Sequence, residues 1–245
     1  FYLLQEVDTL AHRSWKVNQY KAIAEHFMDY CPAFAMNYKA WVPMPVSKPM
    51  GQVRAGLMTM SHLAPLEISR HAFESGYTWP MNLFMLNRCF LAARFRTENQ
   101  KQLVLVNLHN SAFSDAAEIR EKELAALKEF MINESKKGNY VIVGGDWNQN
   151  PPTMDSGNLD KMYRFKPINP PIPADFLPDG WQYAYDPHHT TNRDVNIPYT
   201  QGVNTSTLID FFVLSPEIEL LWVKTTTTGF DVSDHQPIEM KVVLN

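Results

Sequence analysis

Short apolar runs separated by turn residues recur along the chain and predict that strands outnumber helices. Most runs are rich in β-branched or aromatic residues and are shorter than an ordinary helix. The predicted strands cover residues 1–8, 53–62, 89–95, 102–109, 140–146, 207–215, 218–228 and 238–244. Several of them are close enough in sequence to be joined as hairpins. This pattern favours two packed sheets with helices outside them over a doubly wound parallel sheet.

Two segments have the spacing of amphipathic helices. In residues 114–137, Ser114 can cap the first turn, Leu124, Leu127 and Met131 form an inner stripe, and Gly138 follows the last lysines. The spacing in residues 18–30 is carried by Ala22, Ile23, His26, Phe27 and Tyr30. Residues 151–205 are rich in proline and aromatic residues and predict a long excursion. No repeat or linker divides the chain, so we expect one domain over residues 1–245.

Composition excludes several classes of protein. With 245 residues, 45% hydrophobic and 20% charged, the chain can bury a large core. A net charge of -4 provides no global basic field for nucleic acid, although a local basic cleft is compatible with it. Cys31 and Cys89 are expected to be small buried hydrophobes. No stretch is long and apolar enough to span a membrane. Nothing in the sequence assigns a location in the cell.

The stretch GGDWNQNPP, residues 144–152, places a carboxylate, an indole and two amides directly after an apolar strand. Gly, Asp, Asn and Pro are all turn residues, so a simple turn is one interpretation. The other is a site, because buried polar groups cost several kcal/mol unless they have partners. This stretch alone leaves both interpretations open.

Polar residues also stand at the ends of four other predicted strands, which favours a site. The set is Glu6, His109, Asp146, Asn148, Asp210, Asp234 and His235. Singly, each has a bland interpretation as a capping acid, a satisfied core histidine or a turn residue. Together they supply the groups that metal-assisted phosphoryl chemistry needs. Carboxylates hold Mg²⁺ or Mn²⁺, imidazoles handle protons, and an amide donates to a phosphate oxygen.

Five short motifs in order, QE, NLH, GGDWN, LID and SDHQP, resemble the endonuclease/exonuclease/phosphatase superfamily. The resemblance covers residues 2–243. The segment LHNSAFSDAAEI is similar to the deoxyribonuclease and sphingomyelinase members. The resemblance implies an α/β fold of the deoxyribonuclease I type, a four-layer sandwich of two packed mixed sheets flanked by helices. It also implies a Mg²⁺- or Mn²⁺-dependent phosphoric ester hydrolase.

The resemblance implies a role for each motif residue. Glu6 would bind the metal, and Asp234 would lie on the metal side of the site. His235 would contact the scissile phosphate as base or stabiliser, and Asp210 would orient it. His109 would act on the phosphate opposite His235, as acid or stabiliser. Asp146 would position or deprotonate the attacking water, and Asn148 would donate to the phosphate. Trp147, between them, is expected to point into the core.

The sequence departs from the superfamily pattern at three places. The strand that brings an asparagine to the metal is missing upstream of Phe1, and we expect the full gene to encode it. Cys89 stands where deoxyribonuclease has a glutamate that partners the first histidine, which weakens a strict acid role for His109. Trp147 replaces the more usual Phe or Leu, which is a packing change.

The substrate is not fixed by the sequence. Candidate contacts to a phosphate backbone are His12, Arg13, Lys48, Arg54, Arg88 and the segment HHTTNR at 188–193, and each could equally be a solvated charge. The excursion, with Trp181, Tyr183, Tyr185 and Tyr199, is interpreted first as a packed loop. We expect a phosphodiester substrate, with nucleic acid one candidate, and no obligate protein partner, so a monomer. The alternatives are a phosphatase or phospholipase-like enzyme acting on a lipid headgroup or sugar phosphate, and an inactive binding module.

Overall fold

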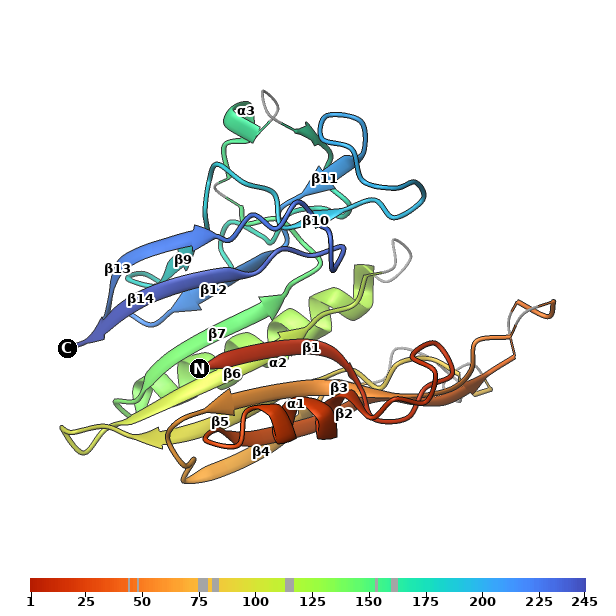
Figure 1. Cartoon of the computed structure of the whole chain (residues 1–245). Coiled ribbons are helices and arrows are strands. Elements are labelled where there is room, and N and C mark those ends of the chain that lie inside the picture. Colours follow the sequence, from red (N-terminus) through yellow and green to blue (C-terminus); the bar gives the residue numbers. More distant parts are fainter. Residues whose placement is uncertain are drawn as a thin grey trace. The chain divides into compact units, whose positions relative to one another are not determined.

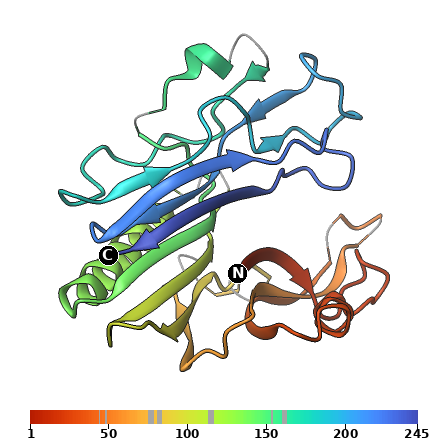
Figure 2. The same ribbon diagram turned by 60° about the vertical axis from the view of Figure 1, so that its left-hand side comes forward.

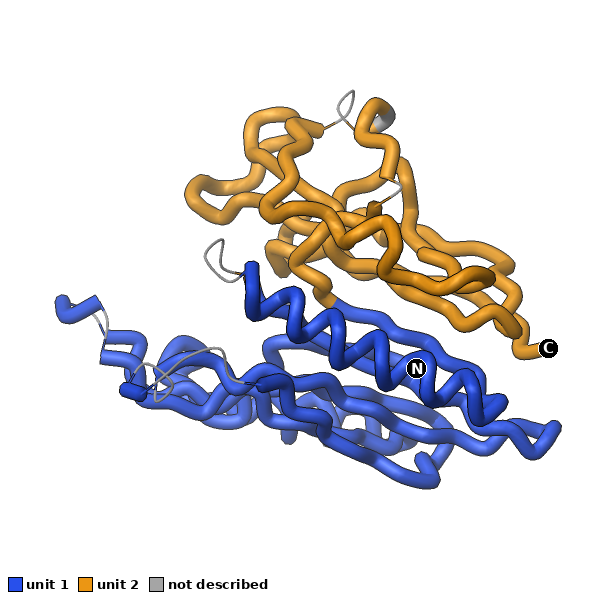
Figure 3. Tube along the Cα trace, turned by 180° about the vertical axis from the view of Figure 1, so that it is seen from behind, with its two compact units in different colours: residues 1–111, 115–145 blue, residues 112–114, 146–245 orange. Residues whose placement is uncertain are grey.

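The chain divides into two compact units in this computed structural model, which describes residues 1–43, 45–47, 49–74, 79–80, 84–112, 117–152, 154–159 and 163–245. Unit 1 comprises Phe1–Ser111 and Asp115–Gly145, and unit 2 comprises Ala112–Ser114 and Asp146–Asn245 (Figure 3). No helix within the described ranges is long and apolar enough to cross a membrane.

Unit 1 contains most of the long elements (Figure 1). These are β1 (Tyr2–Asp8), α1 (Gln19–His26), β2 (Cys31–Val42), β3 (Gly51–Ser61), β4 (Glu67–Ala72), β5 (Cys89–Arg96), β6 (Gln102–His109), α2 (Ala117–Lys136) and β7 (Tyr140–Asp146). Three strands form an antiparallel sheet in the order β1-β3-β2. Strands β4, β5, β6 and β7 are neighbours in that order in a second sheet. The predicted strands at 1–8, 53–62, 89–95, 102–109 and 140–146 are thereby confirmed.

The two sheets of unit 1 pack face to face over a core that includes Cys89. Ala35 and Leu57 of the first sheet cluster with Cys89 and Leu91 of the second. Burial raises the pKa of the Cys89 thiol, as expected for a small buried hydrophobe. Cys31 is only half-buried.

A buried asparagine links the two sheets through polar contacts. Asn107 of β6 is fully buried, and its Nδ2 donates to the carbonyl oxygens of Leu4 and Met58 at 3.2 and 3.1 Å. Its Oδ1 accepts from Gln5 Nε2 at 2.7 Å. Because each polar atom has a partner, the amide costs little to bury and fixes how one sheet lies on the other.

Gly145, at the end of β7, allows a close approach to β6. A Cβ at this position would collide with the carbonyl oxygen of Leu108, and the backbone φ is +135°. Only glycine adopts this conformation without strain. Gly145, directly before Asp146, is therefore required by the packing of β7 on its neighbour.

Helix α2 buries the predicted stripe of Leu124, Leu127 and Met131. The predicted cap, Ser114, lies outside the described residues. The other predicted helix is shorter than expected, because α1 ends at His26 and the following residues form a turn. Asn18 caps α1 by accepting a hydrogen bond from Lys21 N at 3.0 Å.

Unit 2 consists of α3 (Ser156–Leu159), β8 (Arg164–Phe165), β9 (Gln182–Ala184), β10 (Asn192–Arg193), β11 (Thr205–Thr207), β12 (Asp210–Leu214), β13 (Ile218–Thr225) and β14 (Ile238–Leu244). Strands β10, β11 and β8 form a small sheet, β12 pairs with β9, and β13 and β14 form a two-stranded ribbon (Figure 2). The predicted strand at 207–215 is two strands, because Leu208 and Ile209 belong to neither. The predicted excursion holds the short elements.

Aromatic residues of the excursion pack inside unit 2. Tyr183 meets Phe211 edge-on with ring centroids 5.9 Å apart, and Tyr199 lies 4.8 Å from Phe230. Both contacts agree with the interpretation of this segment as a packed loop.

A buried carboxylate near the end of α2 stabilises unit 1. Arg94 Nη1 lies 2.6 Å from Glu134 Oε2, and Lys137 and Asn139 also donate to this carboxylate. The hydrogen bond from Arg94, with support from the other two donors, lowers the pKa of Glu134 to about 2. The sequence pattern gave no sign of this contact.

Replacing Glu134 by Gln should lower the free energy of unfolding at pH 7 by about 2 to 4 kcal/mol, because Arg94 loses a charged partner. The folded pKa of about 2 lies below the ordinary value of 4.5, so the carboxylate stabilises the fold fully above pH 4.5. That stability is lost as the pH falls from 4.5 through about 2. Urea unfolding at neutral and acid pH measures both effects.

The matched control is Glu129→Gln, at an exposed position of the same helix. It should leave the free energy of unfolding almost unchanged. Equal unfolding free energies for Glu134→Gln and the unmodified protein at pH 7 would contradict this account.

Candidate active site

The stretch after β7 is both a turn and part of a polar cluster. Asp146 is 5% exposed, and its Oδ1 accepts a hydrogen bond from the backbone N of Asn148 at 2.8 Å. Asn148 has a φ of +52°, a left-handed conformation that asparagine tolerates better than most residues. The turn aims the Asp146 carboxylate and holds it in place.

Trp147 anchors this turn in the core, as predicted. Its side chain is fully buried, its Nε1 donates to the carbonyl oxygen of Phe211 at 3.0 Å, and its ring stacks on that of Phe211. The centroids are 4.8 Å apart and the planes differ by 7°. With the indole fixed, Asp146 has little freedom to move.

His235 binds Asp210 directly. His235 Nδ1 lies 2.8 Å from Asp210 Oδ2, and Asp210, the first residue of β12, is 7% exposed. The backbone N of Asp210 donates to Thr191 Oγ1 at 3.0 Å. Asp210 therefore holds the imidazole by one nitrogen and leaves the other, Nε2, facing the rest of the cluster.

Asp146 lies on the far side of the His235 ring from Asp210. Its Oδ2 is 3.8 Å from His235 Nε2. One ligand atom from each of Asp146, Asp210 and His235 can be chosen so that all three lie within 4.8 Å of one another. The structure thus brings together three of the predicted site residues, one from each of three motifs.

The carboxylates around His235 control its charge. Burial by itself lowers the pKa of the ring, but three nearby carboxylates, foremost that of Asp210, outweigh burial and raise the pKa to about 10. The imidazole is then a cation at neutral pH.

Asn192 is a member of this cluster that the motifs did not identify. Its Nδ2 lies 2.9 Å from His235 Nε2 and 3.3 Å from the carbonyl oxygen of Asp234. A β-bridge also joins the backbones of Asn192 and His235. The amide can present its NH₂ group to a neutral ring or, turned over, its oxygen to a protonated one. Asn192 belongs to the segment at 188–193, for which the sequence predicts only a contact to phosphate.

Asp234 contributes charge to this group through its side chain and a contact to Asn192 through its carbonyl oxygen. Its carbonyl oxygen accepts from the backbone N of Arg193 at 3.0 Å. Its carboxylate is one of the three that raise the pKa of His235. Among the described residues that could hold a metal together, Asp234 is not included. Its metal role stays a prediction.

Glu6 and His109 belong to unit 1. The Glu6 side chain is 60% exposed and lies 3.3 Å from Arg13 Nη1, and Arg13 also pairs with the buried Asp8 at 3.0 Å. His109, the last residue of β6, is 5% exposed. Its carbonyl oxygen accepts from Arg88 Nη1 at 3.1 Å. The predicted roles of Glu6 and His109 stay predictions.

Two of the predicted phosphate contacts are occupied by protein groups, because Arg13 pairs with carboxylates and Arg88 is buried. Lys48 lies outside the described residues.

The sequence also missed Glu123, a buried carboxylate that contacts Ser111, two residues after His109. Glu123 of α2 is 1% exposed and accepts from the backbone N and the Oγ of Ser111 at 2.9 and 2.7 Å. Burial raises the pKa of Glu123. Glu123 therefore contacts the segment that follows His109, whereas Cys89 supplies no carboxylate there.

A divalent cation fits the group of Asp146, Asp210 and His235 by the chemistry of its donors. Two carboxylates provide the hard oxygen ligands that Mg²⁺ and Mn²⁺ prefer. The imidazole is a poorer ligand for these ions and is already bonded to Asp210 through Nδ1. The donor set suits a hard cation held by the carboxylates with the imidazole beside it.

In the metal-free protein, His235 should stay protonated at neutral pH and titrate near pH 10. Because the folded pKa exceeds the ordinary value of 6.5, its contribution to stability is complete below pH 6.5 and is lost as the pH rises through 10. Ring ¹⁵N shifts measured by NMR report the titration. Asp210→Asn should lower the pKa of His235 by more than about one unit, since it removes the nearest charge.

Asp186→Asn is the matched control, because Asp186 pairs with His189 at 2.9 Å elsewhere in unit 2. It should leave the His235 titration unchanged. A ring that titrates near pH 6.5 in the unmodified protein would show that the carboxylates do not control its charge.

The sequence matches no protein-family model and no curated protein. Solved structures do match. An endonuclease/exonuclease/phosphatase from Beutenbergia cavernae aligns with a TM-score of 0.64 at 15% identity, over 99% of this chain and 62% of that one. D. rerio TDP2 complexed with single strand DNA product aligns with a TM-score of 0.60 at 16% identity, over 98% and 84%.

A mannosyl-6-phosphatase from Bacteroides thetaiotaomicron aligns with a TM-score of 0.57 at 16% identity, over 92% of this chain and 81% of that one. The three alignments each extend over nearly the whole of this chain, and the sheets with few helices match the fold implied by the five motifs. The chain therefore has the deoxyribonuclease I-like fold of the endonuclease/exonuclease/phosphatase proteins.

Proposed function

We propose that this chain is a divalent-metal-dependent hydrolase that cleaves phosphodiester bonds by in-line attack of water. The observation that carries the proposal is the position of His235, held at 2.8 Å by Asp210 with Asp146 3.8 Å from its other ring nitrogen. The fold shared with endonuclease/exonuclease/phosphatase proteins supports the same reaction class, although a fold alone does not assign an activity.

The raised pKa of His235 separates the roles of the histidine and Asp146. In the absence of the cation, the carboxylates of Asp210 and Asp146 raise the pKa of His235 to about 10, so the ring is protonated at neutral pH and is a poor base for water. It can instead stabilise the negative charge that builds up on the phosphate oxygens. Asp146 is then the group that positions the attacking water and takes its proton.

Two amides and a carboxylate support these groups. Asp210 orients the imidazole through Nδ1, and Asn192 contacts the ring at Nε2. Asn148, fixed in the turn after Asp146, would donate its side-chain amide to a phosphate oxygen. Fixing these groups before substrate arrives lowers the cost of reaching the transition state.

Mg²⁺ or Mn²⁺ is the proposed cation. Asp146 and Asp210, which lie close together in unit 2, are the first carboxylates proposed to hold it. Glu6 and Asp234 are further candidate ligands, which the resemblance carried by the five motifs implies. When bound, such a cation neutralises charge on the phosphate and activates water.

We favour a diester over a monoester as the substrate. The loop that follows His109 is similar in sequence to the diesterase members, and the chain has no dense cluster of Lys and Arg for a multiply charged phosphate. The mannosyl-6-phosphatase among the similar structures supports the second candidate, a phosphatase or phospholipase-like enzyme acting on a sugar phosphate or a lipid headgroup.

His235→Ala and Asp146→Ala should each lower kcat by about 10² to 10⁴, because each removes a group that acts on the phosphate or the water. His62→Ala is the control, since His62 forms another Asp–His pair, with Asp29 at 3.6 Å, and should cost little activity. Circular dichroism should show all three variants folded. Small and equal losses in the three variants would argue for an inactive binding module.

A side-by-side assay tests the substrate class. With Mg²⁺ present, the chain should cleave a bis-aryl phosphate or plasmid DNA faster than it releases orthophosphate from monoesters, and chelator should abolish both activities. Sphingomyelin, short RNA and inositol phosphates complete the panel. Cleavage of nucleic acid should also fall steeply with added salt, because phosphate contacts release counterions. Rapid orthophosphate release with no diester cleaved would favour the phosphatase, and full turnover in chelator would overturn the metal mechanism.

A further inference from the structure

The outer end of the β2–β3 hairpin has an unusual surface for a chain with more acids than bases. The hairpin extends past the other strands of unit 1 (Figure 1). Residues 31–66, which contain both strands, include three Lys or Arg residues and no Asp or Glu, whereas the whole chain has 22 Lys and Arg against 26 Asp and Glu. We call the described outer part of this hairpin, residues 38–43, 45–47 and 49–55, the arm.

Large apolar residues of the arm are exposed to solvent. Val46 near its tip is 81% exposed, Trp41 is 57% exposed and Met50 is 40% exposed. Pro45 and Pro49 are exposed beside them. Exposed apolar residues that cluster in this way mark an interaction site more often than scattered single ones do.

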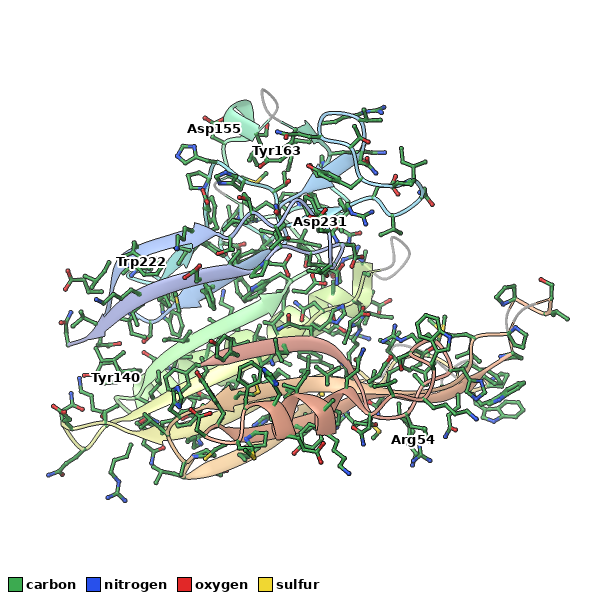
Figure 4. All side chains as sticks on the ribbon, viewed as in Figure 1. Arg54, Tyr140, Asp155, Tyr163, Trp222 and Asp231 are labelled. Carbon is green, nitrogen blue, oxygen red and sulfur yellow. The ribbon has the colours of Figure 1, made fainter. Side chains whose placement is uncertain are left out.

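Cations lie behind the apolar tip on the same face as Trp41. Residues two apart on a strand share a face, so Lys39 lies on the face of Trp41 and about 7 Å farther from the tip. In the β2–β3 register Lys39 is opposite Arg54, and Trp41 is opposite Gln52. Figure 4 labels Arg54, whose side chain projects outward from the hairpin. Within the described part of the chain, neither Lys39 nor Arg54 forms an ion pair.

The loop at residues 9–17 adds a second tryptophan beside the arm. Its backbone runs along β3, because Thr9 N and His12 N donate to the carbonyl oxygens of Arg54 and Gln52 at 2.7 and 2.9 Å. Trp15 in this loop is 88% exposed, and Lys16 next to it is exposed as well. The inner face of the arm is closed by Ala11, which packs on Val53 and Ala55.

From tip to base, the described residues of the arm therefore present Pro45, Val46 and Met50, then Trp41, then Lys39 and Arg54. A membrane surface has matching layers, since acyl chains accept aliphatic residues, the interface accepts tryptophan, and anionic headgroups attract Lys and Arg. Single-stranded nucleic acid fits less well, because bases stack on aromatic rings and gain nothing from an aliphatic tip.

We propose that the arm is a peripheral docking site for membranes that contain anionic lipid. The exposed tip enters the interface, Trp41 lies at headgroup depth, and Lys39 and Arg54 contact the lipid phosphates and carboxylates. This proposal is independent of the proposed hydrolase activity, because it involves none of the residues of the polar cluster in unit 2, and it assigns Arg54, a candidate phosphate-backbone contact in the sequence, to lipid headgroups instead. It supplies a reason for a long hairpin that the polar cluster in unit 2 does not use.

Flotation of the full chain with lipid vesicles tests the proposal. The chain should float with vesicles of phosphatidylcholine and phosphatidylserine and stay behind with phosphatidylcholine alone. Trp41→Ala should weaken binding at least about tenfold, through lost apolar burial. Lys39→Gln and Arg54→Gln each remove one positive charge, and each should weaken vesicle binding about fivefold.

Matched controls separate the arm from general surface effects. Trp222, on the ribbon of unit 2, is 42% exposed, so Trp222→Ala removes a comparably exposed ring outside the arm. Lys241→Gln removes an exposed cation on β14. Neither substitution should change vesicle binding. Trp41→Ala should also leave cleavage of a small soluble diester unchanged, so a loss of vesicle binding is distinguishable from a loss of activity.

Several results would overturn the proposal. One is flotation that does not depend on phosphatidylserine or on Trp41. Another is a fluorescence anisotropy titration in which a single-stranded oligonucleotide binds through Trp41 while vesicles do not bind. A third is a Trp41-dependent dimer in sedimentation of the free protein, which would make the arm a contact between two copies of the chain.

Discussion

The contact between His235 and Asp210 is the interaction on which the polar cluster of unit 2 depends. Two carboxylates near one another and largely removed from water repel each other and lose hydration. A protonated imidazole between them offsets both costs, which is why the pKa of His235 rises to about 10 despite burial. Thr191 fixes Asp210 through its backbone N, and Trp147 fixes the turn that bears Asp146. These contacts therefore hold Asp210 and Asp146 in fixed positions around the protonated ring of His235.

Unit 1 also buries polar side chains that need partners. Asn107, Glu134 and Glu123 are all buried polar residues, and each has its hydrogen-bond partners within the unit. Such groups add little net stability when satisfied, but they strongly disfavour any packing that leaves them unpaired. They fix how the sheets and α2 pack, and so they fix where His109 ends β6. Satisfied polar burial thus orders each unit separately.

The acids of the candidate active site and the residues of the proposed docking arm lie in different parts of the sequence. The acids of the cluster lie after residue 145, whereas residues 31–66 contain no acid at all. A fold shared with a DNA-processing protein and with a sugar phosphatase does not choose a substrate. Unit 1 of this chain carries a long hairpin on which Trp41 is exposed and on which, among the described residues, Lys39 and Arg54 form no ion pair. The proposed reaction of unit 2 and the proposed membrane docking of unit 1 are therefore separate questions with separate tests.

The sequence by itself determined the strands that carry motifs, the inner stripe of α2 and the buried Trp147, because those follow from apolar patterns read along a few neighbouring residues. It missed β2 and β4, because each contains a single β-branched residue and so gives a weak strand signal. It named Asp146, Asp210 and His235 but could not place them together. It missed Asn192, Glu123 and Glu134 as partners. Only the tertiary structure decided these contacts, because His235 meets residues 25 and 43 positions away, and the charge of a buried imidazole depends on which carboxylates folding brings beside it.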